Sequence, residues 1–509
     1  GLDGRAGAAL GRTATDVPAD VMAAAPAIGS PAYEAYFLAR GFAMVFAESL
    51  GSGESTGCPT SGGRNETIGA RSVIDWLNGR APARDEAGAA VRATWTTGKV
   101  GMIGVSYNGT LPNAVATTGV RGLEAIVPIA AISSWYDYYR ADGAVVAPGG
   151  FQGEDTDVLA EYVLTRENPD VCRPVIDELV REQDRLSGDY NDFWAERDYL
   201  RDVRGVRAAT LAVHGLNDWN VKTQHVAQWY EALRERGVPH KIWLHQFGHR
   251  SPLGIRRDEW LRTLNRWFTR YLYDVRNGVE REPRATVQRE DLSWTEEAEW
   301  PAPGARDVRL HLTAGGPATG GLAPRRGGPD ALGTPEAAGV DGHGRPVVES
   351  LVDDASITAE LLAAAAASPH RLSYETAPAA APVRVSGTVA LDLRMSFDRP
   401  AANVTALLVD RAPDGTATVV TRGWTEPQSR HGAHRTDPVR PGHWYSLSLT
   451  MQPDDYVLPA GHRFGVVLLS SDHDYTLRPS PGTELRVDLA RTTVTLPIVG
   501  GASALEPTG

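Results

Sequence analysis

The chain has 509 residues, 42% of them hydrophobic and 22% charged, with a formal net charge of −12 at pH 7. A single hydrophobic core rarely grows beyond ~250–300 residues, so we expect at least two domains and not one small binding module. The longest wholly apolar run, residues 361–367, is much shorter than the ~20 residues that cross a bilayer. The acidic balance is unlike that of nucleic-acid-binding proteins, so we expect a small-molecule or peptide partner, with no nucleic acid and no membrane.

The two cysteines, Cys58 and Cys172, can form at most one disulfide, and the sequence alone does not say whether they pair. They cannot build a structural zinc site on their own, and we expect neither a metal nor an organic cofactor. The sequence opens on Gly1, with neither an initiator Met nor a charged and then apolar leader. It leaves open whether the protein is cytoplasmic or secreted in a bacterium, with secretion slightly favoured, and whether it forms a homo-oligomer.

The first half of the chain alternates short apolar strands with amphipathic helices, from about residue 37 to 275. This alternation is typical of a largely parallel sheet with helices on its faces. The pattern predicts strands at residues 42–46, 100–105, 125–128, 210–214 and 241–245, and helices at 223–236 and 258–274. The expected fold class is therefore α/β.

Two later segments break this pattern. A polar, aromatic and mostly helical stretch at 133–203 fits no strand, and we expect it to be a cap inserted into the sheet domain. After residue 285 apolar residues alternate with outward ones, which predicts antiparallel strands of a β-sandwich, with a long loop at 314–346. The predicted domains are an α/β domain at 1–132 and 204–284, the cap at 133–203, and the sandwich at 285–509.

The strongest local motif joins the predicted strand 100–105 to a helix through Ser106. A serine flanked by small residues at a sharp strand-to-helix turn is the sequence form of a nucleophile elbow, in which the hydroxyl is exposed and the helix N–H groups face a developing oxyanion. The motif departs from G-x-S-x-G, because Asn108 replaces the second glycine and Gly109 follows one residue later.

A nucleophilic serine needs a base, and the base needs an acid that orients it. Asp218 follows the predicted strand 210–214, and His249 follows the strand 241–245. Both therefore fall in loops at the carboxyl ends of strands, in the order Ser, Asp, His that hydrolases of this kind use. His214 and His245 lie inside the strands and are expected to be structural.

These motifs resemble those of a known family. The elbow GVSYNG, the run Ser134–Arg140 (SWYDYYR), the run Gly149–Asp155 (GGFQGED) and the loop HGLNDWNV together resemble the Xaa-Pro dipeptidyl-peptidases, serine peptidases related to cocaine esterase and the α-amino-acid ester hydrolases. The resemblance runs from about Tyr36 to the C-terminus. It implies an α/β-hydrolase sheet with an inserted helical cap and a C-terminal jelly-roll-like β-sandwich.

The resemblance also implies roles for individual residues. Ser106 would be the nucleophile, His249 the general base and then acid, Asp218 the orienting acid, and the backbone N–H of Tyr107 an oxyanion donor. The proline pocket and its surroundings would be formed by aromatic and aliphatic side chains, which suit a ring without an N–H. Those positions are Trp135, Tyr138, Phe151, Leu159 and Val221.

Glu154, helped by Asn220, matches the family's site for the free α-ammonium of the substrate, with Asp155 and Asp157 as alternatives. Family members also have earlier strands and a tyrosine that donates to the oxyanion, and neither is found in residues 1–32. We therefore expect an incomplete N-terminus; the alternatives are that the enzyme is cleaved, or that Tyr33 or Tyr36 is a substitute.

The sequence thus predicts a serine exopeptidase that releases N-terminal Xaa-Pro dipeptides through an acyl-enzyme, acting on peptides with a free N-terminus and proline second. One alternative is a related ester hydrolase or acylase with the same triad and a different pocket. Another is an inactive binding protein whose sandwich binds carbohydrate or a partner protein, which the three ordered triad candidates disfavour.

Overall fold

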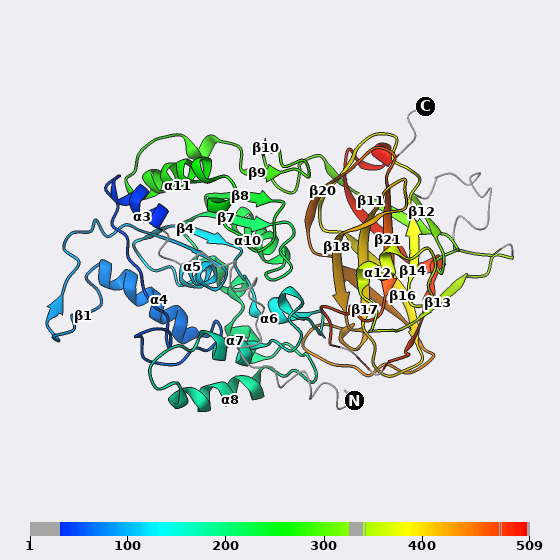
Figure 1. The fold of residues 1–509 in the computed structure, drawn as a ribbon, viewed down its shortest axis with the longest axis horizontal. Helices are drawn as coiled ribbons and strands as arrows, with labels where there is room; N and C mark the ends of the chain where they lie inside the picture. The colour runs from blue at the N-terminus through cyan, green and yellow to red at the C-terminus, as the bar shows by residue number, and fades with distance from the viewer. Residues whose placement is uncertain (1–30, 325–338, 342, 478, 480, 506–509) are drawn as a thin grey trace.

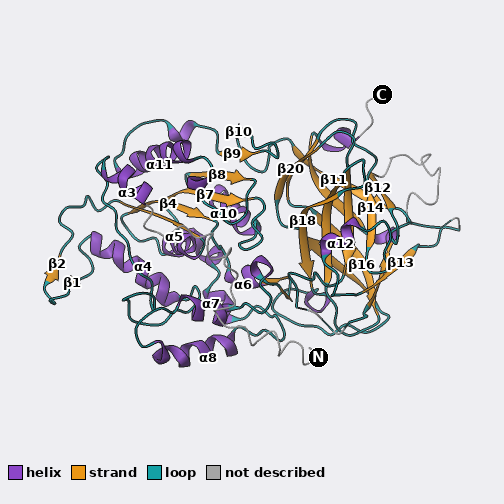
Figure 2. Cartoon of the chain, viewed as in Figure 1, coloured by secondary structure: helices purple, strands orange, loops and turns teal. Residues whose placement is uncertain are grey.

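The computed structural model describes residues 31–324, 339–341, 343–477, 479 and 481–505. Figure 1 shows two parts side by side, a helix-covered sheet drawn in blue to green and a mainly β part drawn mostly in yellow to red. Figure 2 makes the same division visible, because the long helices gather in the first part and most strands in the second. None of the described helices is both long and apolar enough to span a membrane.

The first part is built on a six-stranded sheet in the order β10-β9-β8-β7-β4-β3. All neighbours in it pair in parallel except β9 and β10, which form an antiparallel hairpin at one edge. The strands are β3 (Val100–Val105), β4 (Leu123–Ile129), β7 (Ala209–Gly215), β8 (His240–His245), β9 (Ala285–Gln288) and β10 (Trp294–Glu297). The carboxyl ends of the parallel strands therefore meet at one edge of the sheet.

Helices cover both faces of this sheet, because its central strands are apolar on both sides. In β4, Ile126 packs toward one face and its neighbours Ala125 and Val127 toward the other. The first face is covered by α4 (Arg64–Leu77), α5 (Tyr107–Thr117) and α10 (Gln224–Glu235), and the second by α3 (Pro31–Leu38) and α11 (Arg257–Leu272). A small hairpin, β1 (Ala83–Arg84) and β2 (Ala90–Val91), lies between α4 and β3 in the sequence.

The chain between β4 and β7 leaves the sheet, although these two strands are neighbours in it. This segment contains helices and one two-stranded hairpin. They are α6 (Trp135–Tyr139), β5 (Arg140–Ala141), β6 (Ala144–Val145), α7 (Thr156–Val163), α8 (Arg173–Glu182) and α9 (Asp192–Glu196), with 3₁₀ turns at Pro148–Gly150, Pro169–Cys172 and Tyr199–Gly205. Figure 1 places α7 and α8 at the lower side of the first part, away from α11.

The second part is a β-sandwich around one large apolar core. One layer contains β13, β22, β16, β23 and β11 with β15, β19 and β20, the other contains β14, β21, β17 and β18, and β12 pairs with both layers. Helix α12 (Ala359–Ala364) packs on β17 and β21. The strands are β11 (Ala305–Leu312), β12 (Gly320–Pro324), β13 (Val348–Val352), β14 (Leu372–Glu375), β15 (Val383–Gly387), β16 (Ala390–Phe397), β17 (Val404–Arg411), β18 (Ala417–Thr425), β19 (Trp444–Thr450), β20 (Asp454–Leu458), β21 (Arg463–Leu469), β22 (Glu484–Asp488) and β23 (Thr493–Val499).

Residues 42–46 form no strand, contrary to the sequence prediction. Phe42 and Met44 pack against the core instead, whereas Val45 and Phe46 are exposed. The ring of Phe42 contacts those of Phe37, Phe268 and Tyr273 at centroid distances of 5.3, 6.5 and 5.0 Å. An apolar groove of about 350 Å³ separates this segment from the edge strand β3. In this segment the apolar alternation therefore reflects the packing of Phe42 against α3 and α11, and not the pairing of a strand in the sheet.

Two other boundaries also need correction. β9 and β10 continue the α/β sheet, so the boundary predicted at residue 285 is too early and the first sandwich strand is β11. The predicted loop 314–346 contains β12, while residues 325–338 and 342 lie outside the described residues. The backbone of β12 lies so close to its neighbours that it needs glycine, because a Cβ on Gly320 would lie 2.4 Å from the carbonyl oxygen of Thr313.

Candidate active site

Ser106 lies in a strained turn between β3 and α5, with φ 61° and ψ −128°. Such a backbone conformation is uncommon for a residue with a Cβ and clusters at functional sites. The two flanking glycines permit it, because a Cβ on Gly104 would lie 2.2 Å from the Asn108 carbonyl oxygen and one on Gly109 would lie 2.7 Å from that of Ile129. Gly109 thus allows the backbone of α5 to lie close to β4, although Asn108 occupies the position where the motif usually has its second glycine.

Asp218 and His249 lie together at the same edge of the sheet, in the loops after β7 and β8. Nδ1 of His249 is 2.7 Å from Oδ2 of Asp218. The other oxygen of Asp218 accepts the backbone N–H groups of Asn220 and Val221, both at 3.0 Å. Burial opposes ionisation of this carboxyl, but the charge and hydrogen bond of His249 outweigh it and lower the pKa of Asp218.

Ser106, at the carboxyl end of β3, shares this edge of the sheet with the Asp218–His249 pair. Among the described residues its hydroxyl makes no hydrogen bond to His249. Catalytic hydrogen bonds often tighten only when substrate is bound.

Two neighbouring histidines have structural roles. Nε2 of His214 is 2.7 Å from the carbonyl oxygen of Val221, and burial lowers the pKa of His214. Nε2 of His245 is 3.1 Å from the carbonyl oxygen of Arg250, and burial lowers the pKa of His245 to about 4. Both side chains are therefore uncharged near neutral pH.

The predicted pocket residues from α6 pack beside the serine turn. The ring of Trp135 contacts that of Tyr107 at 5.1 Å and that of Tyr138 at 5.9 Å. Val221 and Leu159 belong to the same apolar cluster. The hydroxyl of Tyr138 donates to Oδ1 of Asn220 at 2.9 Å, so α6 is joined to the loop of Asp218.

Glu154 is buried beside the C-terminal end of α6, although it does not belong to that helix. The hydroxyl of Tyr139, the last residue of α6, donates to Oε1 of Glu154 at 3.1 Å. Burial raises the pKa of Glu154 to about 8. Phe151 is also buried, in the segment that leads to Glu154 and outside the apolar cluster of Trp135.

The two alternative carboxylates are already engaged. Asp155 caps α7 and accepts from Arg140 at 2.9 Å and Arg185 at 3.0 Å. Asp157 accepts from the side-chain amide of Gln183 at 2.9 Å. Glu154 is therefore better placed than either to bind a cation from outside the protein.

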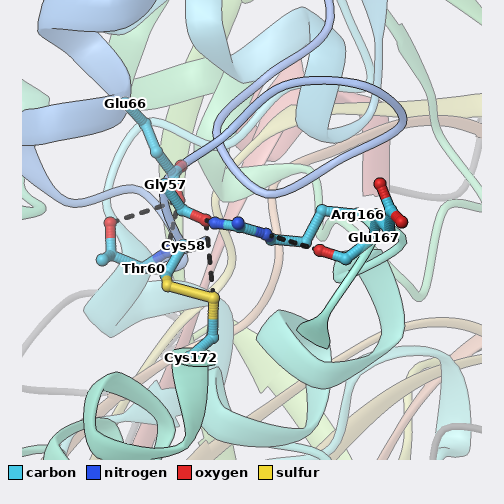
Figure 3. The surroundings of a disulfide bond; sticks show 7 residues. All are labelled: Gly57, Cys58, Thr60, Glu66, Arg166, Glu167 and Cys172. Atoms are coloured by element: carbon cyan, nitrogen blue, oxygen red, sulfur yellow. Dashed lines mark hydrogen bonds between the residues drawn. A yellow bond between two sulfur atoms is a disulfide. The ribbon is translucent and has the colours of Figure 1, made fainter. Parts of the chain in front are cut away.

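Tyr107 is held by residues that the sequence reading did not select. Its hydroxyl donates to Oε2 of Glu66 at 2.6 Å and accepts the N–H of Gly62 at 3.2 Å. Figure 3 shows the loop that carries these contacts tied to the cap by a disulfide between Cys58 and Cys172. The open question of the two cysteines is thus answered, and Arg166 adds a hydrogen bond to the carbonyl oxygen of Gly57 at 2.8 Å.

The two tyrosines considered as a second oxyanion donor have other contacts. The hydroxyl of Tyr33 accepts a hydrogen bond from the indole of Trp260 at 2.8 Å. The ring of Tyr36 lies under the guanidinium of Arg40, 3.6 Å from its centroid. Residues 1–30, in which no donor was found from the sequence, lie outside the described residues. Within the described residues no group of three or more His, Cys, Asp or Glu side chains could hold a metal ion.

A strained serine turn, a histidine–aspartate pair and a mostly parallel sheet define the class of this protein as an enzyme of the α/β-hydrolase type. The family model "X-Pro dipeptidyl-peptidase (S15 family)" matches residues 8–251, and the model "X-Pro dipeptidyl-peptidase C-terminal non-catalytic domain" matches residues 277–504. The chain belongs to the S15 family of X-Pro dipeptidyl-peptidases and is a serine-type hydrolase.

Individual relatives agree with this assignment. A Bacillus anthracis protein named "Putative Xaa-Pro dipeptidyl-peptidase" is 49% identical over 480 residues, which are 93% of this chain and 76% of the relative. A solved α-amino acid ester hydrolase has a TM-score of 0.66 at 17% identity, covering 93% of this chain and 89% of that one. An aminopeptidase from a marine sediment archaeon, Thaumarchaeota, has the same TM-score and identity over 92% and 87% of the two chains. These two likenesses support the fold.

Proposed function

We propose that this enzyme is a serine exopeptidase that releases N-terminal Xaa-Pro dipeptides from peptides with a free amino terminus. The observation that carries the proposal is the placement of Glu154 relative to α6. One end of this five-residue helix packs through Trp135 on Tyr107, beside the candidate nucleophile, and the other end reaches Glu154 through Tyr139. A substrate amino terminus bound at Glu154 would lie a short, fixed distance from Ser106, as cleavage after the second residue requires.

In the proposed reaction Ser106 attacks the carbonyl carbon after proline, and His249 takes the serine proton. Asp218 holds the imidazole and stabilises its charge. The N–H of Tyr107, at the start of α5, donates to the oxyanion. His249 then protonates the leaving amine, the C–N bond breaks, and water activated by His249 hydrolyses the acyl-enzyme to release the dipeptide and free Ser106.

The substrate contacts follow from the same geometry. Trp135, Tyr138, Leu159 and Val221 offer an apolar wall to a proline ring that has no N–H to satisfy. Glu154, ionised when it meets the α-ammonium, forms a charge-assisted pair with it. Phe151, in the segment before Glu154, and Asn220, in the loop after Asp218, complete the proposed substrate site.

The decisive experiment compares three substrates: Ala-Pro-p-nitroanilide, its N-acetylated form and a simple aryl ester. We expect cleavage of the free amine and a large loss of kcat/KM on acetylation. Glu154→Gln should raise KM for the free amine, while the control Asp157→Asn, which alters a carboxylate already bonded within the cap, should not. Equal cleavage of the two peptides would contradict the exopeptidase proposal, and preference for the aryl ester would favour the ester hydrolase alternative.

The role of Ser106 is tested separately by labelling with a fluorophosphonate. We expect the intact protein to be labelled and the Ser106→Ala variant to remain unlabelled. Absence of labelling in the intact, folded protein would contradict the proposed nucleophile.

A further inference from the structure

The loop between β7 and α10 carries Asp218 and Asn220, and the residue between them faces the β-sandwich. The ring of Trp219 lies 6.4 Å from that of Trp424 and 5.9 Å from that of Tyr475. The guanidinium of Arg422 lies 5.0 Å from the centroid of the Trp219 ring. Three side chains of the second part of the molecule thus surround the one side chain that separates two candidate site residues.

Arg422, Trp424 and Tyr475 pack on one another, and we call these three residues the clamp. Arg422 and Trp424 project from the same face of β18, and Oδ2 of Asp472 accepts a hydrogen bond from each, at 3.1 and 3.0 Å. Arg422 also lies 4.8 Å from the centroid of the Tyr475 ring. Asp472 is fully buried and Arg422 is nearly so. Buried ionic pairs carry a large desolvation cost, so simple adhesion of two parts would be served better by apolar side chains.

Hydrogen bonds join the sandwich loop around Tyr475, and also Trp219, to the segment that leads to Glu154. The carbonyl oxygen of Tyr475 accepts the N–H of Ala147 at 2.6 Å, and that of Trp219 accepts the N–H of Gly149 at 2.8 Å. The side-chain amide of Gln152 donates to the carbonyl oxygens of His473 and Thr476, both at 3.3 Å. The same sandwich loop therefore holds both the loop of Asp218 and the approach to Glu154.

A buried cation completes the arrangement. The ammonium of Lys222 lies 5.7 Å from the ring of Trp424 and 6.0 Å from that of Tyr138, and it donates to the carbonyl oxygen of Ala147 at 3.4 Å. The charged groups that act on Lys222 are Asp218, Glu154 and Asp472. Trp424 is thus in contact, through Trp219 and Lys222, with both halves of the candidate site.

We propose that the clamp residues Arg422, Trp424 and Tyr475 are positioning residues that fix the Asp218–Asn220 loop through Trp219. The inference rests on the proposed function, in that Asp218 is taken as the acid of the triad. The proposed triad comes entirely from the α/β part, yet the C-terminal sandwich sets the position of the carboxylate that orients His249. Loosening the clamp should therefore lower the rate of the chemical step without unfolding the protein.

The test uses the full chain with Trp219→Leu, Trp424→Leu and the double variant. Misplacement of a catalytic group by ~1 Å can cost on the order of 10²-fold in rate, so each single variant should lose about 10- to 100-fold in kcat. Because both changes release the same loop, the double variant should lose little more than either single variant. Trp219→Phe, which keeps a ring in the clamp, should recover most of the rate.

A matched control separates positioning from stability. Phe464 is fully buried in the core of the sandwich, so Phe464→Leu also removes a ring from that domain. It should lower Tm while leaving kcat unchanged at temperatures where the protein is folded. Normal kcat in folded Trp219→Leu and Trp424→Leu, or full additivity in the double variant, would overturn the proposal.

The rate of fluorophosphonate labelling keeps this test independent of the peptide substrate. It depends on the serine, the histidine and its orientation, and not on recognition of a dipeptide. If the intact enzyme is labelled but does not cleave Ala-Pro-p-nitroanilide, the proposed function fails, whereas slower labelling of Trp219→Leu and Trp424→Leu still supports the clamp. Labelling of both variants at the rate of the intact enzyme overturns the clamp alone.

Discussion

Glu154 lies in an environment that differs from that of an ordinary surface carboxylate. It is buried, it receives one hydroxyl from Tyr139, and burial raises its pKa to about 8. Asp155 raises this pKa further, whereas Lys222 and Arg185 lower it. The side chain is thus mostly protonated at neutral pH and becomes a good acceptor for an ammonium group only when a cation or a higher pH ionises it.

The first prediction concerns the pH dependence of substrate binding. For Ala-Pro-p-nitroanilide, kcat/KM should rise as Glu154 ionises near pH 8 and fall as the α-amine of the substrate, with a pKa of about 7.7–8.0, loses its proton. Steady-state kinetics from about pH 6 to 10 would measure this. In Glu154→Gln the rise near pH 8 should disappear, and a profile identical to that of the intact enzyme would refute the assignment.

The raised pKa of Glu154 also predicts the direction in which the stability of the protein changes with pH. Because the pKa of Glu154 is higher in the folded than in the unfolded chain, the folded state binds its proton more tightly. This contribution to stability is present below the ordinary pKa of 4.5 and is lost as the pH rises through about 8. As the pH rises from 4.5 to about 8, the Tm of the intact enzyme should therefore fall relative to that of Glu154→Gln.

At the level of residues, the sequence predicted the groups that follow strands better than the groups inside the cap. Asp218 and His249 were found because strand ends in a parallel sheet converge, and the two lie 2.7 Å apart. Tyr139 was missed, because the fold of a helical insertion decides which of its polar groups face Glu154. The available signal for Tyr139 was its place in the same aromatic run as Trp135 and Tyr138.

At the level of elements, the turn from β3 to α5 depends on Gly104. A Cβ at this position would lie 2.2 Å from a backbone oxygen of α5, which cannot move aside as a flexible side chain would. The second prediction is that Gly104→Ala displaces the serine turn and lowers kcat on the order of 10²-fold, because misplacement by ~1 Å has that effect.

The control for this change is Gly254→Ala, since Gly254 has open space around the position of a Cβ. Kinetics and circular dichroism of both variants would separate a displaced turn from general unfolding. A Gly104→Ala enzyme with unchanged kcat would mean that the turn can relax without cost to the nucleophile.

Elements that the sequence misplaced share one physical cause. Phe42 and Met44 pack against α3 and α11 instead of joining β3, and β12 is rich in glycine because Tyr374 and Thr313 lie against it. Apolar periodicity reports which side is buried, not which element buries it. By contrast β3, β7 and β8 were predicted to within one residue at each end, because each is a compact apolar run ending before the polar or glycine-rich loop that carries a candidate residue.

The disulfide adds a covalent link between two elements that also share hydrogen bonds, such as that from Arg166 to the carbonyl oxygen of Gly57. It ties the loop at Cys58, whose neighbours hold Tyr107, to Cys172 at the end of a 3₁₀ turn in the cap. The third prediction is that replacing both cysteines by serine lowers the free energy of unfolding by about 2–4 kcal/mol, because a long loop of the unfolded chain is no longer closed.

Denaturant titrations with and without dithiothreitol provide the measurement. The reductant should lower the stability of the intact protein to that of the double variant and leave the variant unchanged. Equal stability of the two proteins under oxidising conditions would show that the bond does not constrain the unfolded chain.

At the level of the whole molecule, the two parts are joined by a second buried carboxylate besides Asp472. Asp455, at the start of β20, accepts hydrogen bonds from Arg289 of the β9–β10 hairpin, from Arg384 of β15 and from the indole of Trp300. It is fully buried, and Ser386 adds a further donor at 2.7 Å. One side chain thus neutralises charges from the α/β sheet and from the sandwich.

The fourth prediction is that Asp455→Ala destabilises the junction by about 1–3 kcal/mol, since Arg289 and Arg384 keep Glu297 as a partner but lose the buried acceptor that they share with Trp300 and Ser386. Differential scanning calorimetry should then resolve separate transitions for the two parts, and Asp392→Asn, at an exposed position of β16, should not change the profile. Because Asp455 lies in the junction and the clamp holds Trp219 independently, kcat should remain normal below the first transition. A large loss of kcat in folded Asp455→Ala would mean that the junction as a whole, and not the clamp, positions the catalytic loop.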